Sequence, residues 1–158
     1  MKEIYLTNSP LKAQVSDEDY FKVCFSNWML EKHGYVKETT TFHNEDRLHI
    51  VIARFMKLDL SLGVVDHKDT NKRNCDRENL RIATHSENHA NSKGQKQRQG
   101  NYKGVTFDKR RGTYFARLTV DQKSLHLGTF TFDYEAALAY NEAALKYFGP
   151  FALLNEIT

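Results

Sequence analysis

Cysteine is scarce in this chain of 158 residues, and the two that occur, Cys24 and Cys75, lie far apart and form no Cys-x-x-Cys pair. The sequence therefore indicates neither a disulfide framework nor a thiolate zinc site. Long apolar runs are also missing, and no segment approaches the roughly 20 residues that cross a membrane. The amino terminus has no apolar stretch behind a basic start. We expect a soluble, intracellular, cytoplasmic protein without a membrane partner.

Net charge is low overall but uneven along the chain. The formal net charge is +3, and the 40% apolar content is ordinary for a folded domain. Residues 1–62 carry eight Lys or Arg against nine Asp or Glu, whereas residues 92–117 carry eight basic residues against the single acid Asp108. A basic excess gathered in one short stretch favours a polyanion as partner.

The first 47 residues predict a small α+β module. Residues 13–15 read as a strand, Ser16 followed by three acids starts a helix that extends over residues 20–25, and residues 34–36 lie in a second strand. The single tryptophan is expected in the core beneath them. We expect packing from this module, and no chemistry.

A carboxylate and an imidazole that are neighbours in the sequence follow this module. Residues 47–57 have apolar spacings that favour a short helix, although residues 48–51 alone could also be strand. Residues 62–67 read as a strand that ends in Asp66 and His67. Because a regular strand turns neighbours to opposite faces, both serve one site only if the strand twists or ends there.

The next residues predict a loop, a strand and a helix. Residues 68–78 are rich in Asn, Asp, Lys and Arg, which suits a solvated loop, and residues 80–83 form the returning strand. Thr84 and the glutamate three residues later form a capping box. This box starts a helix at His85 and places Asn88 in its first turn.

The polar side chains of this stretch suit hydrolysis of a phosphodiester, which needs an activated water, a cation at the phosphate and stabilisation of the leaving oxygen. His67 ordinarily titrates near neutrality and is suited to accept a proton. Asp66 and Asn88 are hard oxygen donors, which Mg²⁺ or Mn²⁺ prefers. The amide of Asn79 suits hydrogen bonds across the loop that hold the strand of His67 in register.

Simpler interpretations exist for these residues. An Asp-His pair at the end of a strand is more often a surface hydrogen bond, and only its register with Asn79 and Asn88 favours a nuclease-type site. His85 and His89 have the spacing of a helical zinc pair, but no thiolate or third histidine accompanies them. A DNA-facing helix surface is the better interpretation of these two histidines.

The C-terminal part predicts a basic linker over residues 93–100, then a sheet and a helix. The expected strands cover residues 102–107, 114–120 and 124–130. Alternation in the second strand leaves one face of the sheet packed and the other free. A helix over residues 133–148 follows. The side chains expected on its packed side are Ala136, Tyr140, Ala143, Ala144 and Tyr147.

Two parts of the chain each resemble a known family. Residues 66–67 and 79–81, with Thr84 and Asn88, resemble the HNH endonucleases, in the subgroup common among phage and intron-borne homing enzymes. The resemblance implies a beta-beta-alpha metal finger with His67 as general base, Asp66 and Asn88 as metal ligands and Asn79 as the structural asparagine of the catalytic motif.

Four later segments, residues 102–105, 127–130, 136–141 and 152–155, resemble the APETALA-type, or ethylene-response-factor, DNA-binding domain. That domain lays a three-stranded sheet in the major groove and braces it with one helix. The residues expected to contact DNA are Lys93, Lys96, Arg98, Lys103, Lys109, Arg110, Arg111, Arg117, Thr119, Ser124 and His126.

This sequence also departs from the plant domains. Thr106 and Asp108 stand where the plant domains have arginines, and Phe115 where a polar residue is expected, so no target sequence transfers. A phenylalanine replaces the usual capping threonine of the helix, for which Thr131 or Asp133 is the expected cap.

The sequence thus predicts an α+β chain with a beta-beta-alpha metal finger followed by a three-stranded antiparallel sheet and one packing helix. The expected parts are a module over residues 1–47, an HNH nuclease domain over 48–92, the linker over 93–100 and a DNA-binding domain over 101–158. We expect a site-specific homing endonuclease that uses Mg²⁺ or Mn²⁺ and cleaves or nicks double-stranded DNA, as a monomer if it nicks. The alternatives are an inert sequence-specific regulator and an accessory protein that binds DNA without sequence choice.

Overall fold

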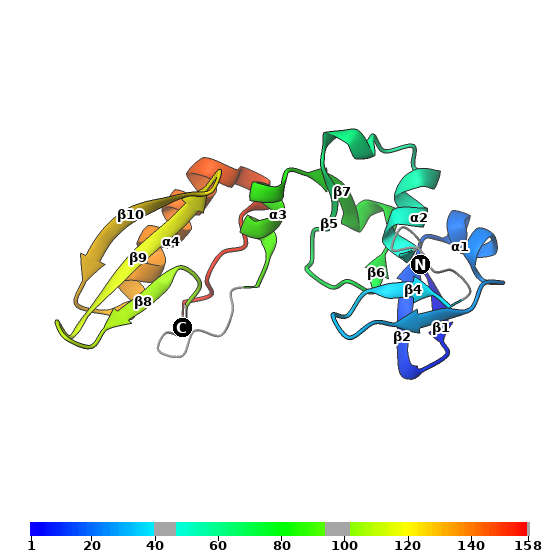
Figure 1. Ribbon diagram of the computed structural model, residues 1–158, viewed down its shortest axis with the longest axis horizontal. Coiled ribbons are helices and arrows are strands. Elements are labelled where there is room, and N and C mark those ends of the chain that lie inside the picture. The colour runs from blue at the N-terminus through cyan, green and yellow to red at the C-terminus, as the bar shows by residue number, and fades with distance from the viewer. Residues whose placement is uncertain (40–46, 94–101, 158) are drawn as a thin grey trace. The chain divides into compact units, whose positions relative to one another are not determined.

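The computed structural model describes residues 1–39, 47–93 and 102–157 (Figure 1). The chain is α+β, as expected, and divides into two compact units, residues 1–84 and 85–158. No helix within the described ranges is long and apolar enough to span a membrane. The expected basic linker lies outside the described residues, with its Lys96 and Arg98, except for Lys93.

A five-stranded sheet forms the base of the first unit, with strand order β4-β3-β1-β2-β6. Its strands are β1 (Lys2–Leu6), β2 (Ser9–Val15), β3 (Trp28–Leu30), β4 (Val36–Glu38) and β6 (Asn74–Cys75). Residues 13–15 lie in β2, which confirms the first expected strand. The second begins only at Val36, because Gly34 has a left-handed φ of 86° and forms a turn.

Two helices cover the core of this unit. Helix α1 (Asp17–Val23) starts after Ser16, and α2 (Leu48–Phe55) confirms the helix expected over residues 47–57. The fully buried side chains of Trp28, Leu48 and Ile52 pack into one cluster with residues of the strands that follow. The hydrophobic core is therefore continuous across residue 47, while the domain limits expected from the sequence stay a prediction.

The polar stretch of residues 68–78 is less solvated than its composition indicated. Strand β6 pairs in parallel with β2, with Val15 beside Cys75, and the Cys75 side chain is completely buried. A short 3-10 helix, Arg77–Asn79, follows. The two-residue strand is formed because β2 offers an unpaired edge at this point, which no local pattern in the sequence reveals.

Two further strands and a helix complete the finger in chain order. Strands β5 (Val64–His67) and β7 (Leu80–Ala83) are antiparallel, and their register places Asp66 opposite Arg81. Helix α3 (His85–Asn91) begins at the predicted residue. The order strand, strand, helix is that of the expected beta-beta-alpha finger.

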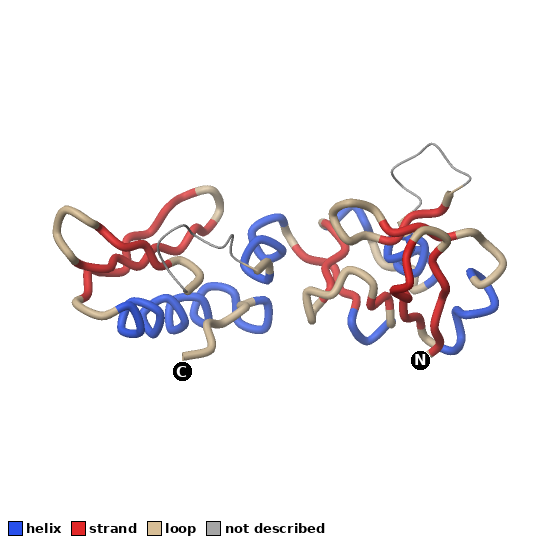
Figure 2. The backbone as a smooth tube through the Cα atoms, turned by 90° about the horizontal axis from the view of Figure 1, so that it is seen from below, coloured by secondary structure: helices blue, strands red, loops and turns tan. Residues whose placement is uncertain are grey.

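The second unit contains a three-stranded antiparallel sheet, and α4 (Asp133–Phe148) packs on one of its faces (Figure 2). The strands are β8 (Val105–Asp108), β9 (Thr113–Val120) and β10 (Lys123–Phe130). Ala116 and Leu118 of β9 are buried, whereas Arg117 and Thr119, which alternate with them, are exposed, and this confirms the predicted alternation. The bounds of α4 are those expected from the sequence.

Three details of this unit differ from expectation. The first strand starts at Val105, because the preceding residues form a turn in which Gly104 has a φ of 75°. Tyr147 is 50% exposed and Phe148 is buried in its place. The cap of α4 is Phe132, whose backbone N–H donates to the Glu135 carboxylate at 3.3 Å, so neither Thr131 nor Asp133 occupies that position.

Candidate functional site

Asp66 is a buried carboxylate paired with an arginine. Arg81 Nε donates to Asp66 Oδ2 at 2.9 Å, and the two side chains are only 5% and 15% exposed, with the carboxylate the more buried. The pairing follows from the register of β5 and β7, which sets the two residues directly opposite each other. Sequence reasoning gave Arg81 no role of its own, although its place in the returning strand is the signal that could have found it.

His67 is the last residue of β5 and is 5% exposed. Its ring centroid lies 5.0 Å from that of His49, and its Nε2 lies 4.0 Å from the Cys75 sulfur. Burial lowers the pKa of His67 to about 4, although the charges of Asp69 and Asp66 raise it. The imidazole is therefore neutral at pH 7 and able to accept a proton. Strand β5 ends at His67, so it is not a regular strand beyond Asp66 that would force the two side chains to opposite faces.

An aromatic stack continues from His67 to a pair of cations. Tyr35 stacks on His49 with 5.1 Å between ring centroids, and Arg47 and Lys72 lie over the Tyr35 ring at 4.6 and 4.2 Å. Burial lowers the pKa of His49 to about 3. Within the described residues, its Nδ1 is a buried atom without a hydrogen-bond partner. The sequence did not single out His49, because its place in an apolar helix predicts burial alone.

Asn79 bridges the loop between the two strands. Its amide oxygen accepts from the backbone N–H of Asp69 at 3.1 Å, and its Nδ2 donates to Asp69 Oδ1 at 3.0 Å and to the carbonyl of Asn74 at 2.8 Å. Burial raises the pKa of Asp69, but hydrogen bonds from Asn74, the Asn71 backbone and Asn79 lower it below its usual range. These contacts cross the loop, while the role of Asn79 in the motif stays a prediction. They also identify Asp69 as a loop residue that the sequence did not reveal.

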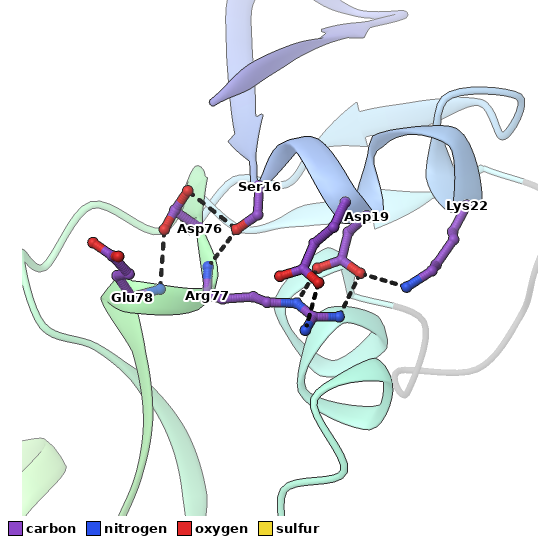
Figure 3. A network of polar contacts seen from close by, with 7 residues as sticks. Ser16, Asp19, Lys22, Asp76, Arg77 and Glu78 are labelled. Atoms are coloured by element: carbon purple, nitrogen blue, oxygen red, sulfur yellow. Dashed lines mark hydrogen bonds and ion pairs between the residues drawn. The ribbon is translucent and has the colours of Figure 1, made fainter.

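The residues just before Asn79 are tied to the N-terminal helix (Figure 3). Arg77 donates to both carboxylate oxygens of Asp19, at 2.6 and 2.8 Å, and Lys22 donates to the same carboxylate at 2.8 Å. Ser16 donates to Asp76 at 3.1 Å and accepts from the Arg77 backbone at 2.9 Å. Asp19 is completely buried. The N-terminal residues therefore fix the end of the loop that carries Asn79.

The fourth residue of the motif belongs to a different compact unit. Asp66, His67 and Asn79 lie in the first unit, whereas Asn88 lies in α3, within the second. Thr84 is the one residue between β7 and α3. Over the residues that the structure describes, no cluster of three His, Cys, Asp or Glu side chains forms a metal site. The ligand set expected here, one Asp and one Asn, is not of that kind.

Four of the expected DNA contacts lie on the free face of the C-terminal sheet. Arg117, Thr119, Ser124 and His126 are exposed there, and Arg117 stands opposite His126 with its guanidinium 4.7 Å from the centroid of Phe115. Lys109, Arg110 and Arg111 are exposed in the turn between β8 and β9. A groove runs along this face. Its lining residues are Asp108, Arg110, Arg111, Thr113, Phe115, Arg117, His126 and Thr129.

Lys103 has a different environment from the other basic residues. Its ammonium donates to the carbonyl oxygens of His89, Ala90 and Ser92, at the end of α3. Burial lowers the pKa of Lys103 to about 8. Exposed Lys93 follows the same helix end. DNA contacts of Lys93 and Lys103 stay predictions, and the structure adds a second role for Lys103, as the partner of three backbone carbonyls.

Two family models match the chain. Residues 46–90 match the model described as HNH endonuclease, and residues 100–150 match the AP2 domain. The first match contains all four motif residues, Asp66, His67, Asn79 and Asn88. The second contains the three-stranded sheet and α4. Both resemblances found in the sequence are thereby confirmed, in the expected order along the chain.

Proposed function

From an HNH endonuclease domain followed by an AP2 DNA-binding domain, we propose a metal-dependent, site-specific endonuclease of the homing type that nicks double-stranded DNA. The observation that carries this proposal is that His67, a buried imidazole that is neutral at pH 7, ends strand β5 directly after the carboxylate of Asp66. One group suits proton transfer and the other suits a cation.

Asp66 and Asn88 are the residues proposed to hold Mg²⁺ or Mn²⁺. The donor chemistry fits, because carboxylate and amide oxygens are the hard ligands that these ions prefer. The hydrogen bond from Arg81 to Oδ2 fixes the orientation of the Asp66 carboxylate. A bound divalent cation would supply charge stabilisation at the scissile phosphate and at the departing 3′ oxygen.

His67 is proposed to remove the proton from the attacking water. Its Nε2 lies 4.0 Å from the sulfur of Cys75. The rings of His49 and Tyr35 restrict how the imidazole tilts. A pKa of about 4 makes His67 a weak base in the DNA-free protein. Phosphates of bound DNA would raise that pKa towards neutrality, where a general base is most effective.

The AP2 sheet is proposed to supply the target selection that the finger lacks. Arg117 projects from the middle strand and is suited to bidentate hydrogen bonds with guanine in the major groove. Lys109, Arg110 and Arg111 in the first turn would contact phosphates and make binding depend on salt. One such nuclease site attacks one strand, so a monomer nicks, and a double-strand break needs a second binding event.

The test uses DNA selected for binding by the chain from a random pool and cloned into supercoiled plasmid. Mg²⁺ should allow wild-type protein to convert this plasmid to relaxed circles, and EDTA or Asp66→Asn should abolish the conversion. His33→Ala is the matched control, since His33 is an exposed histidine whose ring has no place in the proposed site. Selective binding without nicking would support the inert regulator, and binding without sequence choice would support the accessory protein.

A further inference from the structure

Helix α3 is part of the HNH domain by sequence and part of the DNA-binding unit by packing. The HNH match extends to residue 90, yet the second compact unit begins at His85. Ala90 is 4% exposed and belongs to the same apolar cluster as Leu118 of β9 and Tyr140 of α4. Figure 1 shows α3 beside the segment that follows α4, with which it is in contact.

The first turn of α3 is bonded to the turn that joins β9 and β10. Ser86 Oγ accepts a hydrogen bond from the backbone N–H of Asp121 at 3.1 Å. Asp121 and Gln122 have φ angles of 46° and 65°, so they form the tight turn that fixes the register of the two strands. Those strands carry Arg117 and His126, which face the proposed DNA side.

The last turn of α3 is held from two sides. The Lys103 ammonium reaches the carbonyls of His89, Ala90 and Ser92, which is favourable because helix-end carbonyls lack partners within the helix and carry partial negative charge. The backbone N–H of Leu153, beyond α4, also donates to the carbonyl of Ala90 at 3.2 Å. Both ends of α3 are therefore anchored to the DNA-binding unit.

From these contacts we propose that Ser86 and Lys103 are positioning residues through which the DNA-binding unit sets the place of the metal ligand Asn88. The inference rests on the proposed function. A helix of about two turns is not stable alone, so the geometry of α3 is set by what it packs against. Binding of DNA to the β9–β10 hairpin then restrains the Asp121 turn, and with it Ser86 and Asn88. DNA binding and metal binding are coupled as a result.

The test compares full-length wild-type protein with Ser86→Ala, which removes the acceptor for Asp121. The Mn²⁺ dissociation constant is measured by electron paramagnetic resonance, with and without selected DNA. Wild type should bind Mn²⁺ more tightly with DNA than without it. Ser86→Ala should weaken Mn²⁺ binding to the complex by about two- to tenfold, as expected for one lost hydrogen bond, and raise the Mg²⁺ requirement for nicking equally. Its DNA affinity, measured in EDTA, should stay within about twofold of wild type.

Matched variants separate positioning from folding. Ser86→Thr keeps the hydroxyl and should restore Mn²⁺ affinity. Ser9→Ala loses a bond of the same kind and length, from the Leu11 N–H at 3.1 Å in the first unit, and should leave Mn²⁺ binding unchanged. Lys103→Met keeps an unbranched stem without the ammonium and should also weaken Mn²⁺ binding, with DNA affinity measured in parallel.

The outcomes distinguish this inference from the proposed function. Unchanged Mn²⁺ affinity in both Ser86→Ala and Lys103→Met, while wild type nicks DNA, would overturn the positioning role alone. A loss of DNA affinity in EDTA as large as the loss of Mn²⁺ affinity in Ser86→Ala would also overturn it, because the contact would then serve DNA binding without the metal. Wild type that neither binds Mn²⁺ nor nicks would overturn both.

Discussion

Arg77 and Asp19 are 58 positions apart in the sequence, yet the Arg77 guanidinium donates hydrogen bonds to both carboxylate oxygens of Asp19, at 2.6 and 2.8 Å. The pair joins the N-terminal helix to the loop end that precedes Asn79. Residues 1–39 are thus structurally connected to the finger, through this pair and through the pairing of β2 with β6. These residues were expected to contribute packing, and their contacts hold the end of the loop that precedes Asn79.

Arg77→Leu should lower the free energy of unfolding by about 3 kcal/mol, because it leaves the buried Asp19 carboxylate with only part of its charge compensated. Urea unfolding followed by tryptophan fluorescence measures this loss. Lys12→Met is the control, since it breaks the exposed Lys12–Glu3 pair and should leave stability nearly unchanged. Equal, small effects of both substitutions would contradict a structural role for the buried pair.

Acidification should destabilise the first unit over a defined range of pH. Burial lowers the pKa of His49 to about 3, far below the ordinary 6.5. The unfolded chain therefore binds a proton that the folded one does not, and stability is lost as pH falls from about 6.5 towards 3. His49→Phe should reduce the loss between pH of about 7.5 and about 5, with His67 accounting for the remainder. If the urea midpoint falls by the same amount between these two pH values in wild type and in His49→Phe, His49 does not contribute to the acid sensitivity.

The hydrogen bond between Asn79 and Asp69 can be tested by exchanging the amide and the carboxylate of the two side chains. Asn79→Asp would set a second carboxylate against Asp69 Oδ1, which now accepts from the Asn79 amide at 3.0 Å. Repulsion and the lost donor should destabilise the loop by about 2 kcal/mol and reduce nicking at least tenfold. Adding Asp69→Asn returns one amide and one carboxylate to the pair and should recover part of both. No recovery in the double variant would count against the proposed bridge.

Substitution of a basic residue proposed to read a base should affect DNA binding differently from substitution of one proposed to contact phosphate. Arg117→Ala should relax the preference for guanine at one position, at a cost of about 1–3 kcal/mol for the cognate site. Lys109→Ala should weaken binding to all sequences alike and reduce the slope of log affinity against log salt by about one. Salt titrations of binding on selected and scrambled DNA measure both effects. A uniform loss for Arg117→Ala would show that it contacts phosphate and reads no base.

The sequence predicted those features that are local or periodic. The capping box predicted the start of α3, and the alternation of β9 predicted the free face of the sheet. Tyr147 was assigned to the core instead of Phe148 because the predicted stripe followed Ala143 and Tyr147, whereas the buried stripe of α4 follows Ala137, Ala144 and Phe148.

Other features depend on contacts that leave no local signal. His49 reads as one more position of an apolar helix, and its stacking on Tyr35 and His67 depends on three separate segments. Strand β6 has two residues, too few for a period, and exists because β2 has an edge to pair. The assignment of α3 to the DNA-binding unit likewise follows from packing, which the motif spacing of Asn88 does not encode.

The central claim is that His67 removes a proton during hydrolysis, and the most direct measurement is the single-turnover rate of nicking on DNA already bound. His67→Ala should bind selected DNA with unchanged affinity and nick it at least about 100-fold more slowly in saturating Mg²⁺. A rate within about threefold of wild type, at equal DNA affinity, would contradict the assignment of His67 as the base.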